Sequence, residues 1–282
     1  MKLCRIGEIG EEKPVIIDKE NNYRDLSSII PDLNPDTLNF ETFEKIKKTD
    51  ISNLTKLDNS LRVGACVFKP SKFIGIGLNF KDHAEEQNLP IPKEPIIFSK
   101  FTSCITGPND PIIIPKDSNH TDWEVELGFV IGKRATNISI NSALDHVLGF
   151  FLVNDVSERD FQKNKGLTWD KGKGFDTFGP IGPYIVTKDE LPDFQKLNMF
   201  LDVDGKRMQT GNTEKMIFDI KTLVSYMSSC MTLHPGDICC TGTPPGVGEN
   251  MSPPHFLKGG EEVILGIDKL GTQKHKVVSY KD

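Results

Sequence analysis

The stretch of sequence that decides the fold is TDWEVELGFVIGK, at residues 121–133. In a strand, successive side chains point to opposite faces, so Asp122, Glu124 and Glu126 are expected on one face and apolar residues on the other. The apolar run at residues 128–131 is typical of the middle of a buried sheet. Neighbouring carboxylates on one face repel each other unless a positive group lies between them. The pattern alone leaves two interpretations open: a solvated acidic face, or a buried strand whose acids hold a cation.

A second strand-like run also ends in a carboxylate. Residues 149–154 read GFFLVN and are followed by Asp155. Together with Glu124 and Glu126, this acid would give three oxygen ligands without histidine or thiolate. Such a set favours a hard ion, Mg²⁺ or Mn²⁺, over zinc. Water and substrate oxygens would complete the coordination, and an open site of this kind can polarise a carbonyl or hold an enolate.

Short apolar runs dominate the rest of the chain. They are rich in β-branched or aromatic residues and bounded by Gly, Pro, Asn or Asp, which predicts strands, at residues 2–6, 14–18, 73–77, 95–98, 111–114, 125–131 and 147–153. Helical patterns are fewer, at residues 40–46, 80–88, 142–145 and 219–229. The chain is therefore predicted to be a β-rich α+β protein, with a small N-terminal module at residues 1–69 and a main domain at residues 70–282.

Composition and charge argue against several classes of protein. The 282 residues carry a net charge of −6. A nucleic-acid binder normally needs a basic face to neutralise phosphates, so no nucleic acid partner is expected. No apolar stretch is long enough to span a bilayer, and residues 1–10 lack the apolar core of a signal peptide, so the cytoplasm is the expected location and no membrane partner is expected. The chain has no dinucleotide-binding GxGxxG between a strand and a helix and no P-loop, and its six cysteines form no CxxC pair and receive no role.

Several motifs in a fixed order resemble the fumarylacetoacetate hydrolase superfamily. They include the ExE strand, the strand that ends in Asp155, and the later segment KGFDTFGP at residues 173–180. The resemblance covers roughly residues 70–281 and also includes GLNFKDHAEE near its start, FSK at residues 98–100, and TGTPPGVG at residues 241–248. The resemblance implies a mixed β-sandwich roll with few helices, commonly a homodimer.

By this resemblance, Glu124, Glu126 and Asp155 occupy the metal-ligand positions for Mg²⁺ or Mn²⁺. Asp122 has the same strand parity but matches no ligand position, so it is not included. His83 and Glu86 match a His-x-x-Glu dyad that activates water. Residues three apart on a helix share a face, so the carboxylate can hold the imidazole in one tautomer. Without the resemblance, this segment would be interpreted as an exposed polar helix.

The remaining candidate residues also come from the resemblance. Lys173 matches a lysine beside the reacting carbonyl that stabilises developing negative charge, with Lys171 as the alternative if the register is shifted by two residues. The predicted substrate-binding residues, in loops and at strand ends, are Arg159, Gln162, Thr243, Ser99 and Lys100.

The resemblance implies a metal-dependent hydrolase that cleaves a C–C bond in a 2,4-dioxo (acylpyruvate-type) acid through a metal-held enolate. The segment at residues 153–183 is similar to members that act on diketo-deoxy sugar acids, several of which carry a ureidoglycolate lyase label. The presence of both His83 and Glu86 favours hydrolysis. Three alternatives stay open: an isomerase or a decarboxylase of a 2-oxo diacid on the same metal site, and a non-catalytic metal-binding protein. The expected partner is a small-molecule 2-oxo acid.

Overall fold

The larger of the two main sheets takes its strands from both the N-terminal and the C-terminal parts of the chain. The computed structural model describes residues 1–166 and 168–281. All neighbouring strands of this sheet are antiparallel except the parallel pair of β17 and β5. In spatial order its ten strands are β4 (Lys56–Leu57), β3 (Tyr23–Asp25), β2 (Lys13–Ile17), β1 (Lys2–Ile6), β14 (Ile185–Thr187), β11 (Val147–Asn154), β10 (Val125–Ile131), β17 (Ile238–Cys240), β5 (Phe73–Gly77) and β6 (Ile96–Lys100).

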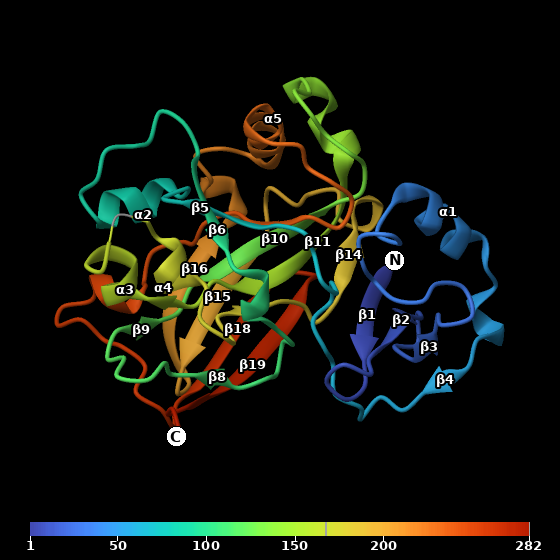
Figure 1. The fold of residues 1–282 in the computed structure, drawn as a ribbon, viewed down its shortest axis with the longest axis horizontal. Coiled ribbons are helices and arrows are strands. Elements are labelled where there is room, and N and C mark those ends of the chain that lie inside the picture. The colour runs from blue at the N-terminus through green and yellow to red at the C-terminus, as the bar shows by residue number, and fades with distance from the viewer. Residues whose placement is uncertain (167, 282) are drawn as a thin grey trace.

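A second sheet packs against the middle of the first. Figure 1 shows β15, β16, β18 and β19 lying beside β10 and β11, and apolar side chains from both sheets form one buried core. Its strands, in spatial order, are β16 (Lys206–Asn212), β15 (Asn198–Val203), β18 (Glu262–Ile267), β19 (Gly271–Val278) and β8 (Ile112–Ile113). Apart from β8, these strands were not predicted. In β19, polar residues alternate with the buried ones and dilute the apolar signal.

Helices are few and short. The α-helices are α1 (Phe40–Lys48), α2 (Lys81–Glu86), α3 (Arg159–Lys163), α4 (Asp170–Lys173) and α5 (Ile220–Cys230). The two longest begin at capping side chains: Asn39 accepts a hydrogen bond from Thr42 and Asp219 accepts one from Thr222. The predicted helix at residues 142–145 is a 3₁₀ helix, Ile140–His146. Within the described residues, no helix combines the length and apolar character that crossing a membrane requires.

The predicted fold class is confirmed, because the structure is β-rich with two stacked sheets and few helices. The N-terminal residues share the larger sheet with the rest of the chain, since Lys2 lies opposite Val186 and Leu3 opposite Ile185. Figure 1 shows β1 to β4 and α1 grouped at one side of the molecule. The division of the chain at residue 69 stays a prediction.

The acidic strand is interrupted rather than continuous. The short β9 (Thr121–Asp122) pairs with β12 (Ser157–Glu158), and β10 begins only at Val125. Between them, the Trp123 N–H bonds the side chain of Asp122, and the Glu124 N–H bonds the side chain of Asn154. The predicted strand at residues 125–131 is β10, but the alternation expected from Asp122 to Glu126 does not run along one strand, because side-chain acceptors replace the backbone ladder at Trp123 and Glu124.

Candidate active site

Three buried carboxylates share a cavity of about 200 Å³ at the end of β10 and β11. Glu124 precedes β10, Glu126 lies on it, and Asp155 follows β11; they are 6%, 2% and 0% exposed. The backbone N–H of Asp155 donates to the Glu124 carbonyl at 2.9 Å, so the pairing of the two strands brings the acids together. The structure thus brings together the three residues that were predicted as metal ligands.

Two buried lysines contact these acids. The Nζ atom of Lys173, at the end of α4, lies 2.6 Å from Glu124 Oε2 and 2.7 Å from Asp155 Oδ2. The Nζ atom of Lys100, on β6, lies 2.5 Å from Asp155 Oδ1 and 2.6 Å from the Lys173 carbonyl. Burial lowers the pKa of Lys173, but the charges of Asp155 and Glu124 outweigh it and raise the pKa above its ordinary value. Lys171 is exposed, so Lys173, and not Lys171, is the lysine of α4 that contacts these acids.

Arg159 is the third cation and begins α3. Its guanidinium lies 2.8 Å from both Asp122 Oδ2 and Glu124 Oε1, and its Nη1 donates to Gln162 Oε1 at 3.0 Å. Asp122 also accepts hydrogen bonds from the backbone N–H groups of Gly248 and Glu249. Asp122 therefore holds Arg159 and the loop around residue 248 in place. This structural role accounts for a carboxylate at a position that matches no metal ligand. Gln162 and Arg159 both line the cavity.

The surroundings of Glu124 and Glu126 shift the pKa values of the two acids in opposite directions. Burial raises the pKa of Glu124, but Lys173 and Arg159 outweigh it and bring the pKa to about 2. Burial, together with the charges of Asp155 and Glu124, raises the pKa of Glu126 well above its ordinary value. Glu126 accepts a hydrogen bond from the backbone N–H of Gly242 at 2.8 Å. Within the described part of the chain it forms no ion pair.

The unpaired Glu126 is what makes these residues fit a divalent cation. Ligand atoms of Glu126, Asp155 and Cys240 all lie within 4.8 Å of one another. Burial, with the nearby charges of Glu126 and Asp155, raises the pKa of the Cys240 thiol well above its ordinary value, so the donors that remain are oxygens, which suit a hard ion. Glu124 reaches the same cavity but its two oxygens face Lys173 and Arg159. A cation here would offset the charge of the one acid of the three that forms no ion pair with a described residue.

The predicted dyad lies on α2, and its His83 lines the same cavity. His83 Nδ1 lies 2.9 Å from Glu86 Oε2. Glu86 also accepts hydrogen bonds from the Gly246 backbone N–H at 3.0 Å and from Asn250 Nδ2 at 3.1 Å, which ties α2 to the loop at residues 241–250. Burial raises the pKa of Glu86, but the hydrogen bonds from His83 and Asn250 outweigh it and lower the pKa. An ionised Glu86 only accepts, so Nδ1 of His83 carries the proton.

Thr243 lines the cavity but its hydroxyl is already engaged. Its Oγ1 donates to the Val125 carbonyl at 2.9 Å and accepts from Gln209 Nε2 at 2.8 Å. Gln209 in turn accepts from the Val125 N–H at 2.9 Å. These bonds hold the loop against the start of β10, so Thr243 positions Gly242 and its bond to Glu126. A substrate contact by Thr243 stays a prediction.

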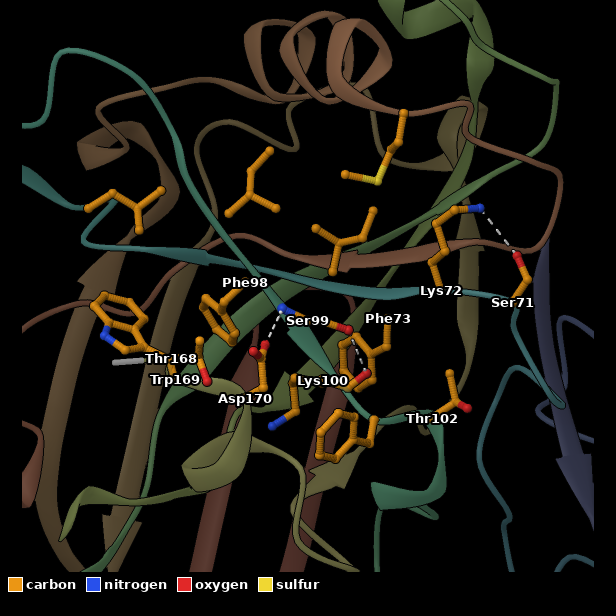
Figure 2. Close-up of a pocket in the computed structure, with 15 residues that line it drawn as sticks. Ser71, Lys72, Phe73, Phe98, Ser99, Lys100, Thr102, Thr168, Trp169 and Asp170 are labelled. Carbon is orange, nitrogen blue, oxygen red and sulfur yellow. Dashed lines mark hydrogen bonds between the residues drawn. The ribbon is translucent and has the colours of Figure 1, made fainter. Parts of the chain in front are cut away.

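Ser99 lies outside the cavity. Alternation along β6 buries Lys100 and leaves Ser99 exposed. The Ser99 N–H donates to Asp170 Oδ1 at 2.9 Å, and Ser99 lines a neighbouring hollow of about 670 Å³. Figure 2 shows this hollow, with Ser99 beside Asp170 and with Trp169 and Phe98 at one side. Lys100 acts through its ion pair with Asp155 and is not among the residues that line the smaller cavity.

An aromatic pair separates the two hollows and lines both. The rings of Phe98 and Trp169 lie 5.6 Å apart at 55°. Each ring rests against a glycine of β5: a β-carbon at Gly75 would overlap Phe98, and one at Gly77 would overlap Trp169. The sequence GIG at residues 75–77 could have predicted this close approach, since glycine within a strand often marks a place where another group packs closely against the backbone.

Two further residues beside the predicted site residues were missed: Gln87, which lines the cavity, and Cys240, which lies near Glu126 and Asp155. Gln87 lies 2.7 Å from His83 through their Nε2 atoms, and its position four residues after His83 on a helical pattern was the available signal. Cys240 lies at the carboxylates because Gly128 of β10 pairs with it. No local pattern reveals that pairing, which joins residues far apart in the chain.

Comparisons with known proteins identify the family of this chain. Residues 72–278 match the family model described as "Fumarylacetoacetate (FAA) hydrolase C-terminal". A protein of Burkholderia ambifaria (strain MC40-6), whose name gives a provisional assignment as a hydrolase, is 54% identical over 274 residues, which cover 97% of each chain.

Solved structures share the fold along the whole chain. The fumarylacetoacetate hydrolase of Exiguobacterium antarcticum is 31% identical with a TM-score of 0.87, over 99% of this chain and 100% of that chain. The 5-carboxymethyl-2-hydroxymuconate delta-isomerase of Mycobacterium smegmatis is 31% identical with a TM-score of 0.79, over 100% of each chain. The maleylpyruvate hydrolase of Sphingobium sp. SYK-6, solved with manganese(II) and pyruvate, is 25% identical with a TM-score of 0.83, over 100% of each chain. With its buried carboxylates, its His-x-x-Glu dyad and a family match across most of its length, this chain belongs to the fumarylacetoacetate hydrolase family of enzymes.

Proposed function

We propose that the protein is a divalent-metal-dependent hydrolase that cleaves a C–C bond in a 2,4-dioxo acid of the acylpyruvate type. The observation that carries the proposal is that one cavity of about 200 Å³ is lined by His83 of the dyad, by Lys173 and by the three acids. A base, a fixed positive charge and a set of oxygen donors are what hydrolysis of a dioxo acid requires.

Glu124, Glu126 and Asp155 are the residues that would hold Mg²⁺ or Mn²⁺. When bound, such an ion acts as a Lewis acid that polarises a ligand oxygen and offsets negative charge on a 2-oxo acid. The buried and unpaired Glu126 supports this assignment. So does the manganese(II) and pyruvate complex of the Sphingobium maleylpyruvate hydrolase, whose fold this chain shares.

His83 is the proposed base. With its Nδ1 proton held by Glu86 at 2.9 Å, the Nε2 lone pair is free of a proton and can take one from water. The water oxygen then bonds to the C4 carbonyl carbon of the substrate, and the C3–C4 bond breaks with its electron pair left on C3. C3 takes up a proton, so the products are pyruvate and the carboxylic acid of the acyl group.

Lys173 is placed to stabilise the negative charge that develops on the attacked carbonyl. Two of its three N–H groups face Glu124 and Asp155, which leaves one donor for the substrate. Arg159 is committed to Asp122 and Glu124, so we assign it a positioning role. The side-chain amide of Gln162 accepts from Arg159 through Oε1, and its Nε2 remains for a substrate oxygen.

An isomerase is the second candidate. The M. smegmatis isomerase is as similar in sequence, 31%, as the E. antarcticum hydrolase, and a base such as His83 can move a proton between carbons as well as take one from water. For the hydrolase, a diketo-deoxy sugar acid is the proposed class of natural substrate, and its sugar-derived chain would then be the acyl group.

The deciding experiment is release of pyruvate from acetylpyruvate, measured with Mg²⁺ or Mn²⁺ and again after chelation. The proposal expects release that depends on the metal and is lost on chelation. Oxaloacetate and an unsaturated 2-oxo diacid are assayed in parallel for decarboxylation and isomerisation. Turnover of those compounds without pyruvate release from any acylpyruvate would replace the hydrolase with one of the alternatives. Metal-dependent thermal stabilisation with no turnover at all would indicate a non-catalytic metal-binding protein.

A further inference from the structure

His83 is hydrogen-bonded at both ring nitrogens. Nδ1 lies 2.9 Å from Glu86 Oε2 and Nε2 lies 2.7 Å from Gln87 Nε2. Because the Glu86 carboxylate only accepts, the ring proton of a neutral His83 lies on Nδ1 and Nε2 presents its lone pair. The amide group of Gln87 therefore donates to that lone pair.

The bonded lone pair is the one that the proposed reaction uses. A lone pair that accepts a hydrogen bond from Gln87 cannot at the same time take a proton from water. Both side chains line the cavity of about 200 Å³, so the contact between them lies where a substrate would enter. His83 itself is only 5% exposed, which leaves water few other routes to Nε2.

Gln87 can move without disturbing α2. It follows the last residue of the helix, and its backbone N–H donates to the His83 carbonyl at 3.2 Å. The backbone is therefore tied down while the side chain, half-buried at the cavity, keeps three torsions, the last of which is broad. A rotation of that side chain uncovers Nε2 and leaves the bond between His83 and Glu86 in place.

We propose that Gln87 is a positioning residue that covers the Nε2 lone pair of His83 in the ligand-free protein and gives it up to water when substrate fills the cavity. The inference rests on the proposed function for its kinetic consequence, but the covered lone pair itself does not. A purely structural contact between residues four apart on a helix would have the same geometry. The structural role and the covering role predict different kinetics when Gln87 is replaced.

Kinetics separate the two. In the wild type, the hydrogen bond between Gln87 and His83 breaks when substrate binds, so its free energy weakens substrate binding and does not affect the chemical step. Gln87→Leu should therefore lower KM and leave kcat unchanged. A neutral hydrogen bond corresponds to a factor of about two to ten, which is the expected rise in kcat/KM for acetylpyruvate. Gln87→Asn is too short to reach Nε2 and should behave in the same way. Glu85→Leu, an exposed position on the same helix, is the matched control and should change neither constant.

A second measurement does not depend on turnover. In uniformly ¹⁵N-labelled, Mg²⁺-loaded protein, the N–H···N bond should give a ¹⁵N–¹⁵N scalar coupling between the Gln87 amide and His83 Nε2. The coupling should be absent in Gln87→Leu and present in Glu85→Leu, with the His83 signals assigned from a His83→Asn variant.

The outcomes are distinct. A coupling together with a KM-only effect supports the proposal. No coupling in the ligand-free protein overturns it, and so does a Gln87→Leu variant that loses kcat or that matches the wild type in both constants. If no acylpyruvate is turned over, the proposed function fails, and the coupling still decides whether Gln87 covers the lone pair.

Discussion

The ammonium nitrogen of Lys173 lies 2.7 Å from a carboxylate oxygen of Asp155, with both side chains buried. The same nitrogen lies 2.6 Å from Glu124. Removing one partner from a buried ion pair leaves an uncompensated charge, which is far more costly than removing an exposed pair. Lys173 is therefore expected to matter for folding as well as for chemistry.

Lys173→Met should abolish pyruvate release and lower the free energy of unfolding by about 3–5 kcal/mol. Denaturant unfolding and the acetylpyruvate assay measure the two effects. Lys171→Met is the matched control, because Lys171 is exposed two residues away and should keep both activity and stability. Equal losses in the two variants would contradict the assignment of Lys173.

Glu126 predicts a pH dependence of the metal-free protein. Its folded pKa is raised well above 4.5, so the folded state binds a proton that the unfolded state has already lost. Stability should therefore fall as pH rises from about 4.5 toward the raised pKa. Mg²⁺ takes the place of that proton, so the gain in Tm on adding Mg²⁺ should grow with pH over the same range. Glu126→Gln should remove both trends, and a Mg²⁺ effect that is independent of pH would count against Glu126 as a ligand.

His83→Ala should lower kcat for acetylpyruvate by about 10²- to 10⁴-fold while the stabilisation by Mg²⁺ stays as in the wild type. The reason is that His83 contacts Glu86 and Gln87 and none of the three acids. Glu85→Ala, on the exposed side of α2, is the control. Retained turnover in His83→Ala would exclude this histidine as the base.

The cysteines should differ sharply in reactivity. Cys230 is exposed and the other five are buried, and burial raises the pKa of Cys4 to about 12 and that of Cys104 to about 11. Because the thiolate is the reactive form, a chromogenic disulfide reagent at pH 8 should titrate one thiol in the native protein and six after unfolding. A fast reaction of Cys240 would show that the carboxylate cavity is more open than its burial indicates.

The residues of the site were expected from the family resemblance, and local sequence patterns explain part of their arrangement. The apolar runs placed β10 and β11, and the acids at their ends then had to meet because antiparallel neighbours pair side by side. Spacing of three residues placed His83 and Glu86 on one face of α2. Strand alternation could also have predicted that Ser99 and Lys100 point to opposite faces of β6, with Lys100 buried and Ser99 exposed.

Other features depend on contacts between distant residues. Part of the break between β9 and β10 arises because the side chain of Asn154, on β11, accepts a hydrogen bond from the Glu124 N–H. The place of Cys240 follows from the pairing of β10 with β17. Neither has a local signature, because each requires partners that only the folded chain brings together.

The glycines of β5 give this enzyme a way to change its substrate range without changing its chemistry. Trp169 and Phe98 lie where they do because Gly77 and Gly75 have no side chains, and none of the four carries a charge. A single methyl group at residue 77 would overlap the indole of Trp169, so the ring that lines both hollows would have to shift and the shape of both hollows would change. Selection for smaller or larger acyl groups could thus act on a backbone strand behind the site, at positions that a search limited to polar residues would overlook.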